Sequence, residues 1–386
     1  MKNIKKFLAL AIVAAMTVGL VACGSQAAEA PAEEPAEEAA EEEAEEPEAE
    51  EAEAEEPAAE EEAAEEPAEE PAADILIGYT YPTANNEFWG NALTYINQVA
   101  DTLGFKLQAD DCNNDQAEQI QDVDAMISAG IQGLVLAPQD ASVVPGILDT
   151  CKSNNIPVVI VDRWPGDELV AGEDYIAFLG PDDETAGYEQ AKSLIEGGCK
   201  KLVGLGGFQG TSVAEGRKAG LDKALAEYPD VELLQFEYVG ENTDDGDAGM
   251  RNLLSAHEDL DGVWCYNDSL ALASVNVLKE AGLIPGVKVG GMDLLSPAVD
   301  SMSAGELWFS TGGHYYQSAF AALILYDTLM GYEYDGDPVV KISLLAVSQD
   351  NLDEFKAKYR SGEGVDWTTM TKTQNPDAEY VFNLSL

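Results

Sequence analysis

The sequence is poor in histidine and cysteine, and this scarcity excludes several kinds of chemistry. Its 386 residues include two histidines and five cysteines, with no C-x-x-C pair. A zinc site needs closely spaced His and Cys ligands, and a Ser-His-Asp triad needs a histidine beside a nucleophile. The glycine-rich stretch 204–210 also lacks the spacing of a dinucleotide-binding fingerprint. We therefore expect no metal, no cofactor and no enzyme activity.

Basic residues are also scarce. The chain has 20 Lys and Arg against 73 Asp and Glu, which gives a formal net charge of −53. No Lys or Arg occurs between Lys6 and Lys106. A nucleic-acid partner requires a basic surface, so none is expected.

Long apolar runs are absent except near the N-terminus. The run at 7–21 follows three lysines and is too short for a lasting transmembrane helix, so it predicts a secretory signal. It ends in Leu-Val-Ala-Cys23, which resembles a bacterial lipobox. We expect 1–23 to be a lipoprotein signal peptide, Cys23 to carry the lipid, and the mature protein to be extracytoplasmic and anchored to the outer face of the cell membrane.

The segment 24–73 consists almost entirely of Ala, Glu and Pro. Like charges repel along it, prolines interrupt any helix, and it has no large apolar side chain to bury. We expect a disordered acidic linker. The cysteines beyond it, Cys112, Cys151, Cys199 and Cys265, are scattered, which favours buried free thiols without excluding disulfides.

From residue 74 onward, short β-branched strands alternate with helical patterns. The first half predicts strands at 74–81, 105–109, 131–137 and 156–161, and helices at 88–103, 114–129 and 143–153. The second half predicts strands at 176–179, 201–205, 231–238, 262–266, 287–292 and 307–311, and helices at 184–197, 213–228, 246–257, 270–282, 297–304 and 315–330. This alternation predicts an α/β fold with two doubly wound parallel-sheet lobes.

The repeated layout predicts how the chain divides between the lobes. We expect 74–180 plus 314–336 to form the N-terminal lobe and 181–313 plus 337–359 the C-terminal lobe, with a last strand at 339–345. Three crossings, near 180–181, 312–313 and 335–338, would form a three-strand hinge. The extension 360–386 is expected to pack loosely on one lobe.

The strand at 156–161 ends in Asp162, Arg163 and Trp164. In an open α/β sheet, ligands bind beyond the carboxyl ends of the strands, and a carboxylate beside a guanidinium can bind hydroxyl groups. The alternative is a structural ion pair at the end of a core strand. Four other strand ends carry similar chemistry, at 85–89, 210–217, 266–268 and 292–293, so a cleft between the lobes is expected to hold a ligand.

These motifs, in this order, resemble the ribose-binding protein family of periplasmic sugar-binding proteins, over about residues 75–334. The resemblance implies that aromatic side chains sandwich a sugar ring while Asp, Asn and Arg bind its hydroxyl groups. The ligand-binding residues that it implies are Asn86, Phe88, Trp89, Asp162, Arg163, Arg217, Asn267 and Asp293.

The sequence departs from that family at three places. Ala137 stands where the family usually has Asn, Glu241 or Asn242 replaces an aromatic, and Gly313 replaces a glutamine, with His314 beside it. The resemblance therefore implies sugar binding in general and leaves ribose itself in doubt. His314 is equally consistent with a structural and a binding role.

Several implied site residues have structural alternatives. Phe88 and Trp89 could belong to the core, and Arg217 could pair with nearby acids, Glu215 or Asp222, in solvent. We expect Asp268 to cap the following helix and Asn267 to point at the ligand. Trp164 could stack on a sugar or pack at the rim.

The resemblance implies a monomeric solute-binding lipoprotein of an ABC importer. It would capture a monosaccharide or related polyol in the cleft and deliver it to the permease with its ATPase. The alternative is a sensor that presents a sugar or polyol to a membrane kinase or chemoreceptor. The neighbouring genes would separate the two. A DNA-binding repressor of the same fold is excluded by the signal and the acidic N-terminus.

Overall fold

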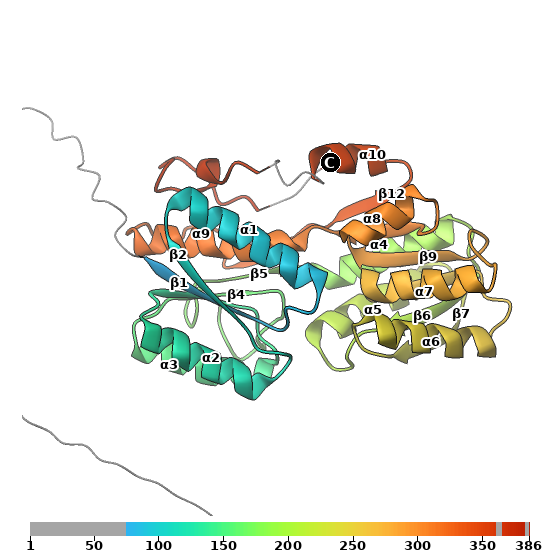
Figure 1. Cartoon of the computed structure of the whole chain (residues 1–386), viewed down its shortest axis with the longest axis horizontal. Helices are drawn as coiled ribbons and strands as arrows, with labels where there is room; N and C mark the ends of the chain where they lie inside the picture. The colour runs from blue at the N-terminus through green and yellow to red at the C-terminus, as the bar shows by residue number, and fades with distance from the viewer. Residues whose placement is uncertain (1–74, 360–364, 383–385) are drawn as a thin grey trace, which may run out of the picture. The chain divides into compact units, whose positions relative to one another are not determined.

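Two six-stranded sheets, one in each lobe, organise the chain (Figure 1). The computed structural model describes residues 75–359, 365–382 and 386, which belong to the unit Ala68–Leu386. The predicted signal peptide, Cys23 and the acidic linker lie outside the described residues. Within the described residues, no helix combines the length and apolar character needed to cross a membrane.

The N-terminal lobe has the strand order β11-β5-β4-β3-β1-β2, parallel throughout. Its strands are β1 (Leu76–Tyr81), β2 (Lys106–Asp111), β3 (Gly133–Leu136), β4 (Val158–Val161), β5 (Ala177–Pro181) and β11 (Val339–Ile342). Its helices are α1 (Glu87–Leu103), α2 (Gln116–Ala129), η1 (Ala141–Val143), α3 (Val144–Ser153), η2 (His314–Tyr316) and α9 (Gln317–Leu329). Helices α1 and α9 cover one face of the sheet, and α2 and α3 cover the other.

The C-terminal lobe repeats this layout with the order β12-β10-β9-β8-β6-β7, in which only β12 runs antiparallel. Its strands are β6 (Lys201–Gly206), β7 (Glu232–Tyr238), β8 (Gly262–Cys265), β9 (Lys288–Asp293), β10 (Phe309–Gly312) and β12 (Leu345–Ser348). Its helices are α4 (Asp183–Glu196), α5 (Ser212–Glu227), α6 (Thr243–Ala256), α7 (Asp268–Glu280), α8 (Ser296–Ser303) and α10 (Leu352–Lys358). The predicted fold class, two doubly wound α/β lobes, is confirmed.

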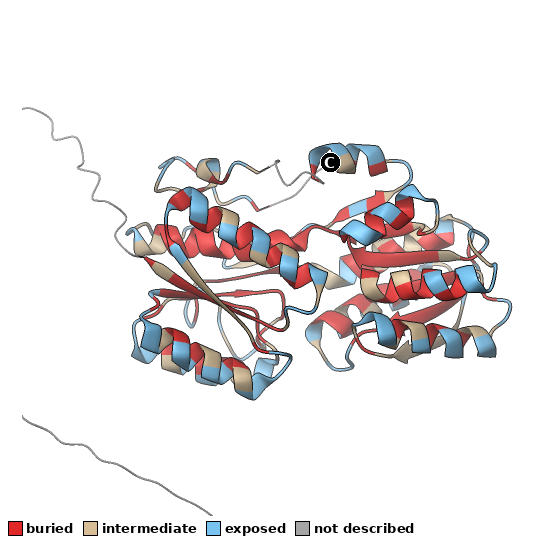
Figure 2. Cartoon of the chain, viewed as in Figure 1, coloured by how far each residue is buried: buried red, intermediate tan, exposed pale blue. Residues whose placement is uncertain are grey.

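The central strands are buried on both faces, as their unbroken apolar runs predict (Figure 2). All four residues of β4 are buried, and so are all four of β3 and of β8. The four cysteines at 112, 151, 199 and 265 are buried and free of disulfides. Because the strands themselves are apolar and buried, the polar side chains lie just beyond the strand ends, where each sheet faces the other lobe.

The third crossing lies further along the chain than the sequence predicted. Strand β11 pairs with β5 in the N-terminal lobe, whereas β12 pairs with β10 in the C-terminal lobe. The chain therefore crosses at 343–344, and both the crossing predicted at 335–338 and the assignment of 337–342 to the C-terminal lobe are wrong. The sequence shows one strand-like run at 339–345, and its pattern does not show that its two ends join different sheets.

Residues 365–382 of the C-terminal extension pack firmly on the N-terminal lobe, so the expectation of loose packing is wrong. Trp367 and Phe382 are buried against Phe320 of α9, with ring centroids 6.0 and 4.7 Å away. Asp327 of α9 is fully buried. Its carboxylate accepts hydrogen bonds from Thr371, Lys372, Thr373 and Tyr380. These contacts bind the extension, which begins with η3 (Trp367–Met370), to α9.

Candidate ligand-binding site

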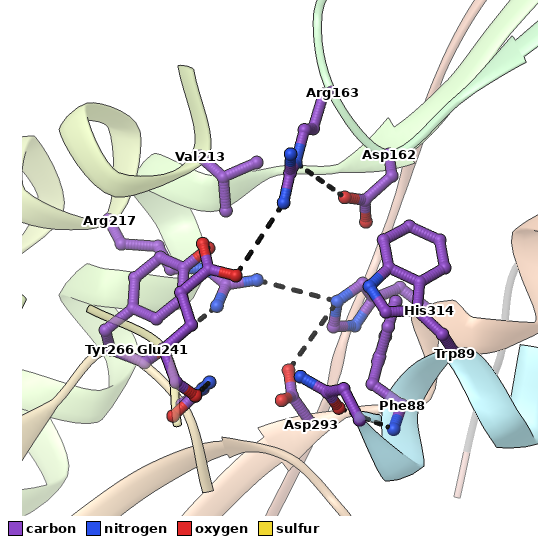
Figure 3. A pocket seen from close by; sticks show the side chains of 12 residues that line it. Phe88, Trp89, Asp162, Arg163, Val213, Arg217, Glu241, Tyr266, Asp293 and His314 are labelled. Atoms are coloured by element: carbon purple, nitrogen blue, oxygen red, sulfur yellow. Dashed lines mark hydrogen bonds and ion pairs between the residues drawn. The ribbon is translucent and has the colours of Figure 1, made fainter. Parts of the chain in front are cut away.

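A cavity between the lobes is lined by the ends of strands from both sheets. It is small, with about 320 Å³ of space when its opening to solvent is counted. Its lining residues are Asn86, Phe88, Trp89, Asp162, Arg163, Val213, Arg217, Glu241, Tyr266, Asn267, Asp293 and His314 (Figure 3). All eight residues implied by the family resemblance therefore meet in one cavity, and their contact with a ligand stays a prediction.

Asp162 and Arg163 reach the cavity from the end of β4. Asp162 has φ 69°, a left-handed conformation that costs a non-glycine residue about 1–3 kcal/mol and is typical of functional sites. Its carboxylate accepts a 2.8 Å bond from Gln317 Nε2. Arg163 Nη1 donates to the backbone carbonyl of Gln139, 2.9 Å away. Both side chains are thus held by the N-terminal lobe itself, which leaves Arg163 Nη2 directed across the cleft.

Asn86, Phe88 and Trp89 enter at the start of α1, which follows β1. Asn86 is the N-cap: its Oδ1 accepts a 2.8 Å bond from the backbone N–H of Phe88, so its amide NH₂ remains for the cavity. The rings of Phe88 and Trp89 meet edge to face, 5.0 Å apart. Both rings are buried in the N-terminal core and also line the cavity. The structural interpretation of this aromatic pair is therefore confirmed, and its contact with a ligand stays a prediction.

Arg217 is the buried cation of the C-terminal lobe. Its Nε donates to Asp183, 2.9 Å away, and its Nη1 donates to the backbone carbonyl of Tyr266, 2.8 Å away. The predicted alternative, a solvent pair with Glu215 or Asp222, is wrong, because α5 turns Arg217 toward the cleft. Burial raises the pKa of Asp183 to about 7, and the guanidinium of Arg217 opposes that shift.

The cap expected of Asp268 is made by Asn267, which also lines the cavity as expected, whereas Asp268 does not line it. Asn267 is the N-cap of α7, since its Oδ1 accepts a 2.9 Å bond from Leu270 N–H, while its Nδ2 donates to the carbonyl of Glu241. Asp268 is fully buried and accepts bonds from Leu295 N–H and the Ser310 hydroxyl. Asn and Asp side chains can both cap a helix. Which of the two caps α7 depends on the loop after β9, because Leu295 in that loop donates to Asp268, and the sequence pattern does not give the position of the loop.

Asp293 ends β9 and mirrors Asp162 in the opposite lobe. It too has a positive φ, of 122°, and only 5% of its surface is exposed. A side chain at Gly312 would place its Cβ 2.3 Å from the carbonyl carbon of Asp293, so the hinge strand requires glycine there. Burial raises the pKa of the Asp293 carboxyl well above its usual range, and Arg217 opposes the shift.

Four cavity residues are missing from the predicted set: Val213, Glu241, Tyr266 and His314. Tyr266 follows β8 directly and Glu241 follows β7 within three residues. Both therefore lie just past the carboxyl end of a strand, as the predicted site residues do, and the same reasoning could have found them. Trp164, in contrast, lies away from the cavity. Its ring meets Phe178 edge to face at 5.0 Å and its Nε1 donates to Asp167.

Direct contacts join the lobes across and beside the cavity. Arg163 Nη2 lies 3.7 Å from Glu241 Oε2, and His314 Nε2 lies 3.5 Å from Arg217 Nη2. Burial lowers the pKa of His314 well below its usual value, so the imidazole is neutral. At the rim, Ser296 N–H donates to Glu87.

The donor set is suited to a small polar molecule with several hydroxyl groups. Carboxylates and guanidinium groups form charge-assisted bonds to hydroxyls, and aromatic faces contact the apolar face of a ring. Among the described residues, no group of three or more His, Cys, Asp or Glu side chains is arranged to hold a metal ion.

Comparison with known proteins identifies the family. The family described as "Periplasmic binding protein domain" matches residues 77–333, about two thirds of the chain, and the chain belongs to it. The chain is 29% identical over 245 residues to the xylitol-binding protein of Mycolicibacterium smegmatis, covering 62% of this chain and 68% of that protein. It is also 29% identical over 240 residues to the ribose import binding protein of Escherichia coli, covering 60% and 76%. The resemblance drawn from the sequence is confirmed, and both relatives are named as binding proteins.

Solved structures confirm the fold. A periplasmic sugar-binding protein from Pseudomonas fluorescens aligns with a TM-score of 0.72 at 23% identity, covering 80% of this chain and 98% of that one. A galactofuranose binding protein aligns with a TM-score of 0.69 at 20% identity, covering 74% and 99%.

Proposed function

We propose that the protein captures a monosaccharide or a related polyol in the cavity between its lobes. The observation that carries this proposal is the set of strand-end carboxylates and guanidinium groups from both lobes, beside the aromatic pair Phe88 and Trp89, around one small cavity. The relatives support the ligand class, because their names include ribose import, xylitol-binding and D-galactose binding proteins.

We further propose that the protein delivers its ligand to an ABC importer. The ribose import binding proteins among its relatives support this role. Cys23 would carry the lipid anchor on the outer face of the membrane, and the acidic segment 24–73 would act as a spacer between the anchor and a monomeric folded part. Replacing Cys23 with Ser should abolish labelling of the protein by radioactive palmitate in growing cells, and continued labelling would contradict the anchor.

The proposed mechanism is hinge closure. The chain passes between the sheets after β5, after β10 and between β11 and β12. A ligand that bonds to Asp162 in one lobe and Asp293 in the other binds better to the closed form, so it shifts the population toward closure. The permease would then recognise the closed pair of lobes.

The test is a thermal-shift screen of pentoses, hexoses and polyols, followed by calorimetric titration. We expect at least one of these to stabilise the protein, and Asp162→Ala to remove that shift while the protein stays folded. Glu168→Ala is the matched control, because Glu168 is exposed and lies six residues further along, outside the cavity lining. Stabilisation by amino acids and by no sugar or polyol would refute the proposed function.

A further inference from the structure

The charges of the cavity do not balance. Three carboxylates line it, those of Asp162, Glu241 and Asp293, against two guanidinium groups, those of Arg163 and Arg217. His314 adds no positive charge, because its imidazole is neutral. The lining therefore carries one more negative charge than positive when all its carboxylates are ionised.

The balance becomes more negative when the partners of each arginine are considered. Arg217 forms its short ion pair, 2.9 Å, with Asp183 behind the cavity wall. Arg163 lies between two carboxylates, 3.9 Å from Asp162 and 3.7 Å from Glu241. Each guanidinium group thus has an acid of its own before Asp293 is counted.

Asp293 is the carboxylate without a cation of its own. It is 95% buried, and it accepts no hydrogen bond from the described residues; its nearest ionisable partner is the neutral His314, with Nε2 3.8 Å from Oδ1. Burial raises its pKa, Arg217 opposes the shift, and the charges of Asp268, Asp162 and Glu241 raise the pKa further. A buried carboxylate in such surroundings is stabilised by a hydrogen-bond donor from the ligand, and most by a donor that carries positive charge.

Glu241 makes this imbalance a property of this chain. It supplies the third carboxylate of the lining, and by the family resemblance either Glu241 or Asn242 stands where an aromatic side chain is usual. Its Oε1 accepts a 3.0 Å bond from the Tyr266 hydroxyl, which holds the carboxylate at the cavity. Position 241 therefore adds a fixed negative charge where a neutral sugar needs none.

We propose that the ligand carries a protonated amine, as an amino sugar or an amino polyol does, with its ammonium group in the part of the cavity lined by Asp293 and Glu241. This inference rests on the proposed function and specifies its ligand class. The ammonium group supplies the missing positive charge and donates to carboxylates in charge-assisted bonds. Asp162, Arg163 and Asn86 bind the hydroxyl groups.

The test compares amines with their uncharged counterparts by calorimetric titration at pH 7. The sets are D-glucosamine, D-glucose and N-acetyl-D-glucosamine; D-galactosamine, D-galactose and N-acetyl-D-galactosamine; and 1-amino-1-deoxy-D-sorbitol with D-sorbitol. At least one amine is expected to bind about tenfold or more tightly than its neutral counterparts, as a bond to a charged group provides. Asp293→Asn and Glu241→Gln keep the shape of each side chain and should each reduce that ratio severalfold, whereas the exposed control Glu168→Gln should not change it.

Each result decides the proposal. If neutral sugars bind as tightly as the amines, or more tightly, the charge inference is wrong while the proposed function stands, and a proton on Asp293 then supplies the balance. If neither class binds and no sugar or polyol of the thermal-shift screen stabilises the protein, the proposed function falls and the inference falls with it. If amines are preferred but both variants keep the preference, the site of the ammonium group is wrong. The wild-type comparison decides the ligand class even if a variant does not fold.

Discussion

Asp327→Ala is predicted to loosen the C-terminal extension and lower the stability of the N-terminal lobe. The Asp327 carboxylate is fully buried in α9 and accepts hydrogen bonds at both of its oxygens. Two of the donors are backbone N–H groups, those of Lys372 at 2.8 Å and Thr373 at 3.0 Å. The others are hydroxyl groups, including that of Tyr380 at 2.9 Å. One carboxylate therefore organises a whole turn of the extension.

The cost follows from what the substitution leaves unpaired. Hydroxyl groups can rotate to other acceptors, but the two N–H groups are fixed by the backbone. An unsatisfied, largely buried donor costs about 1–3 kcal/mol, so two of them together with the lost charge-assisted bonds should cost about 3–5 kcal/mol. At about 2 °C per kcal/mol for a folded unit of this size, the midpoint of thermal unfolding should fall by roughly 6–10 °C.

The assay is thermal unfolding followed by circular dichroism, with limited proteolysis to report release of the extension. Asp335→Ala is the matched control. Asp335 pairs with the side chain of Lys372 in the same turn, but it is 70% exposed, and a surface ion pair contributes about 1 kcal/mol or less. If Asp327→Ala unfolds within 2 °C of Asp335→Ala, the buried carboxylate does not hold the extension.

Three further predictions concern the site and the lobe that carries it. Asp162→Asn should weaken binding of the ligand found in the screen by about tenfold or more in calorimetry without changing the unfolding midpoint by more than about 2 °C, because it removes one charge-assisted bond. The folded-state pKa of Asp183, about 7, lies above its usual value, so the contribution of this carboxyl to stability is full at low pH and is lost as pH rises toward 7. Arg217→Ala removes the cation that lowers this pKa, so the loss of stability should extend above pH 7. In urea unfolding, the substitution should be more destabilising at pH 8 than at pH 6. Gly187→Ala should lower the free energy of unfolding by about 1–3 kcal/mol, because the added Cβ would lie 2.0 Å from the Arg217 carbonyl oxygen. Gly90→Ala should raise it by about 0.5–1 kcal/mol, because the added Cβ meets nothing within 4 Å and alanine favours the helix α1. Equal effects of the two substitutions would contradict the packing argument.

The sequence predicts the site better than it predicts the edges of the fold, for a physical reason. A buried parallel strand is an unbroken apolar run, so the residue at which it ends is visible in the sequence, as at Val161 and Met292. Since all carboxyl ends of a parallel sheet lie at one edge, polar residues just past those ends must lie near one another. That rule places Asp162 at an edge of one sheet and Asp293 at the corresponding edge of the other, and the expected cleft between the lobes brings the two edges together.

The features that the sequence did not predict are those in which a strand or side chain could contact either of two partners of the same kind. The run 339–345 has the alternation of one strand, yet its first part completes one sheet and its continuation, β12, completes the other. Asn267 and Asp268 are both good helix caps, and the position of the Leu295 N–H decides between them. The extension is attached through Asp327, whose single charge inside an apolar helix gives no indication of its donors.

The contacts between the lobes also determine what a ligand must do to be bound. The rim contact from Ser296 N–H to Glu87 involves no group that faces the cavity, so it can persist whatever occupies the cleft. The contact between Arg163 and Glu241, in contrast, joins two cavity side chains across the cleft at 3.7 Å. A ligand hydroxyl or ammonium group that enters between them replaces that long ion pair with shorter charge-assisted bonds to the ligand. The net binding free energy is therefore the energy of the new bonds less that of the ion pair that is lost. If the ligand pairs with Asp293 as proposed, selectivity depends on that residue, because Asp162 and Glu241 already accept hydrogen bonds from Gln317 and Tyr266, whereas Asp293 accepts none from the described residues.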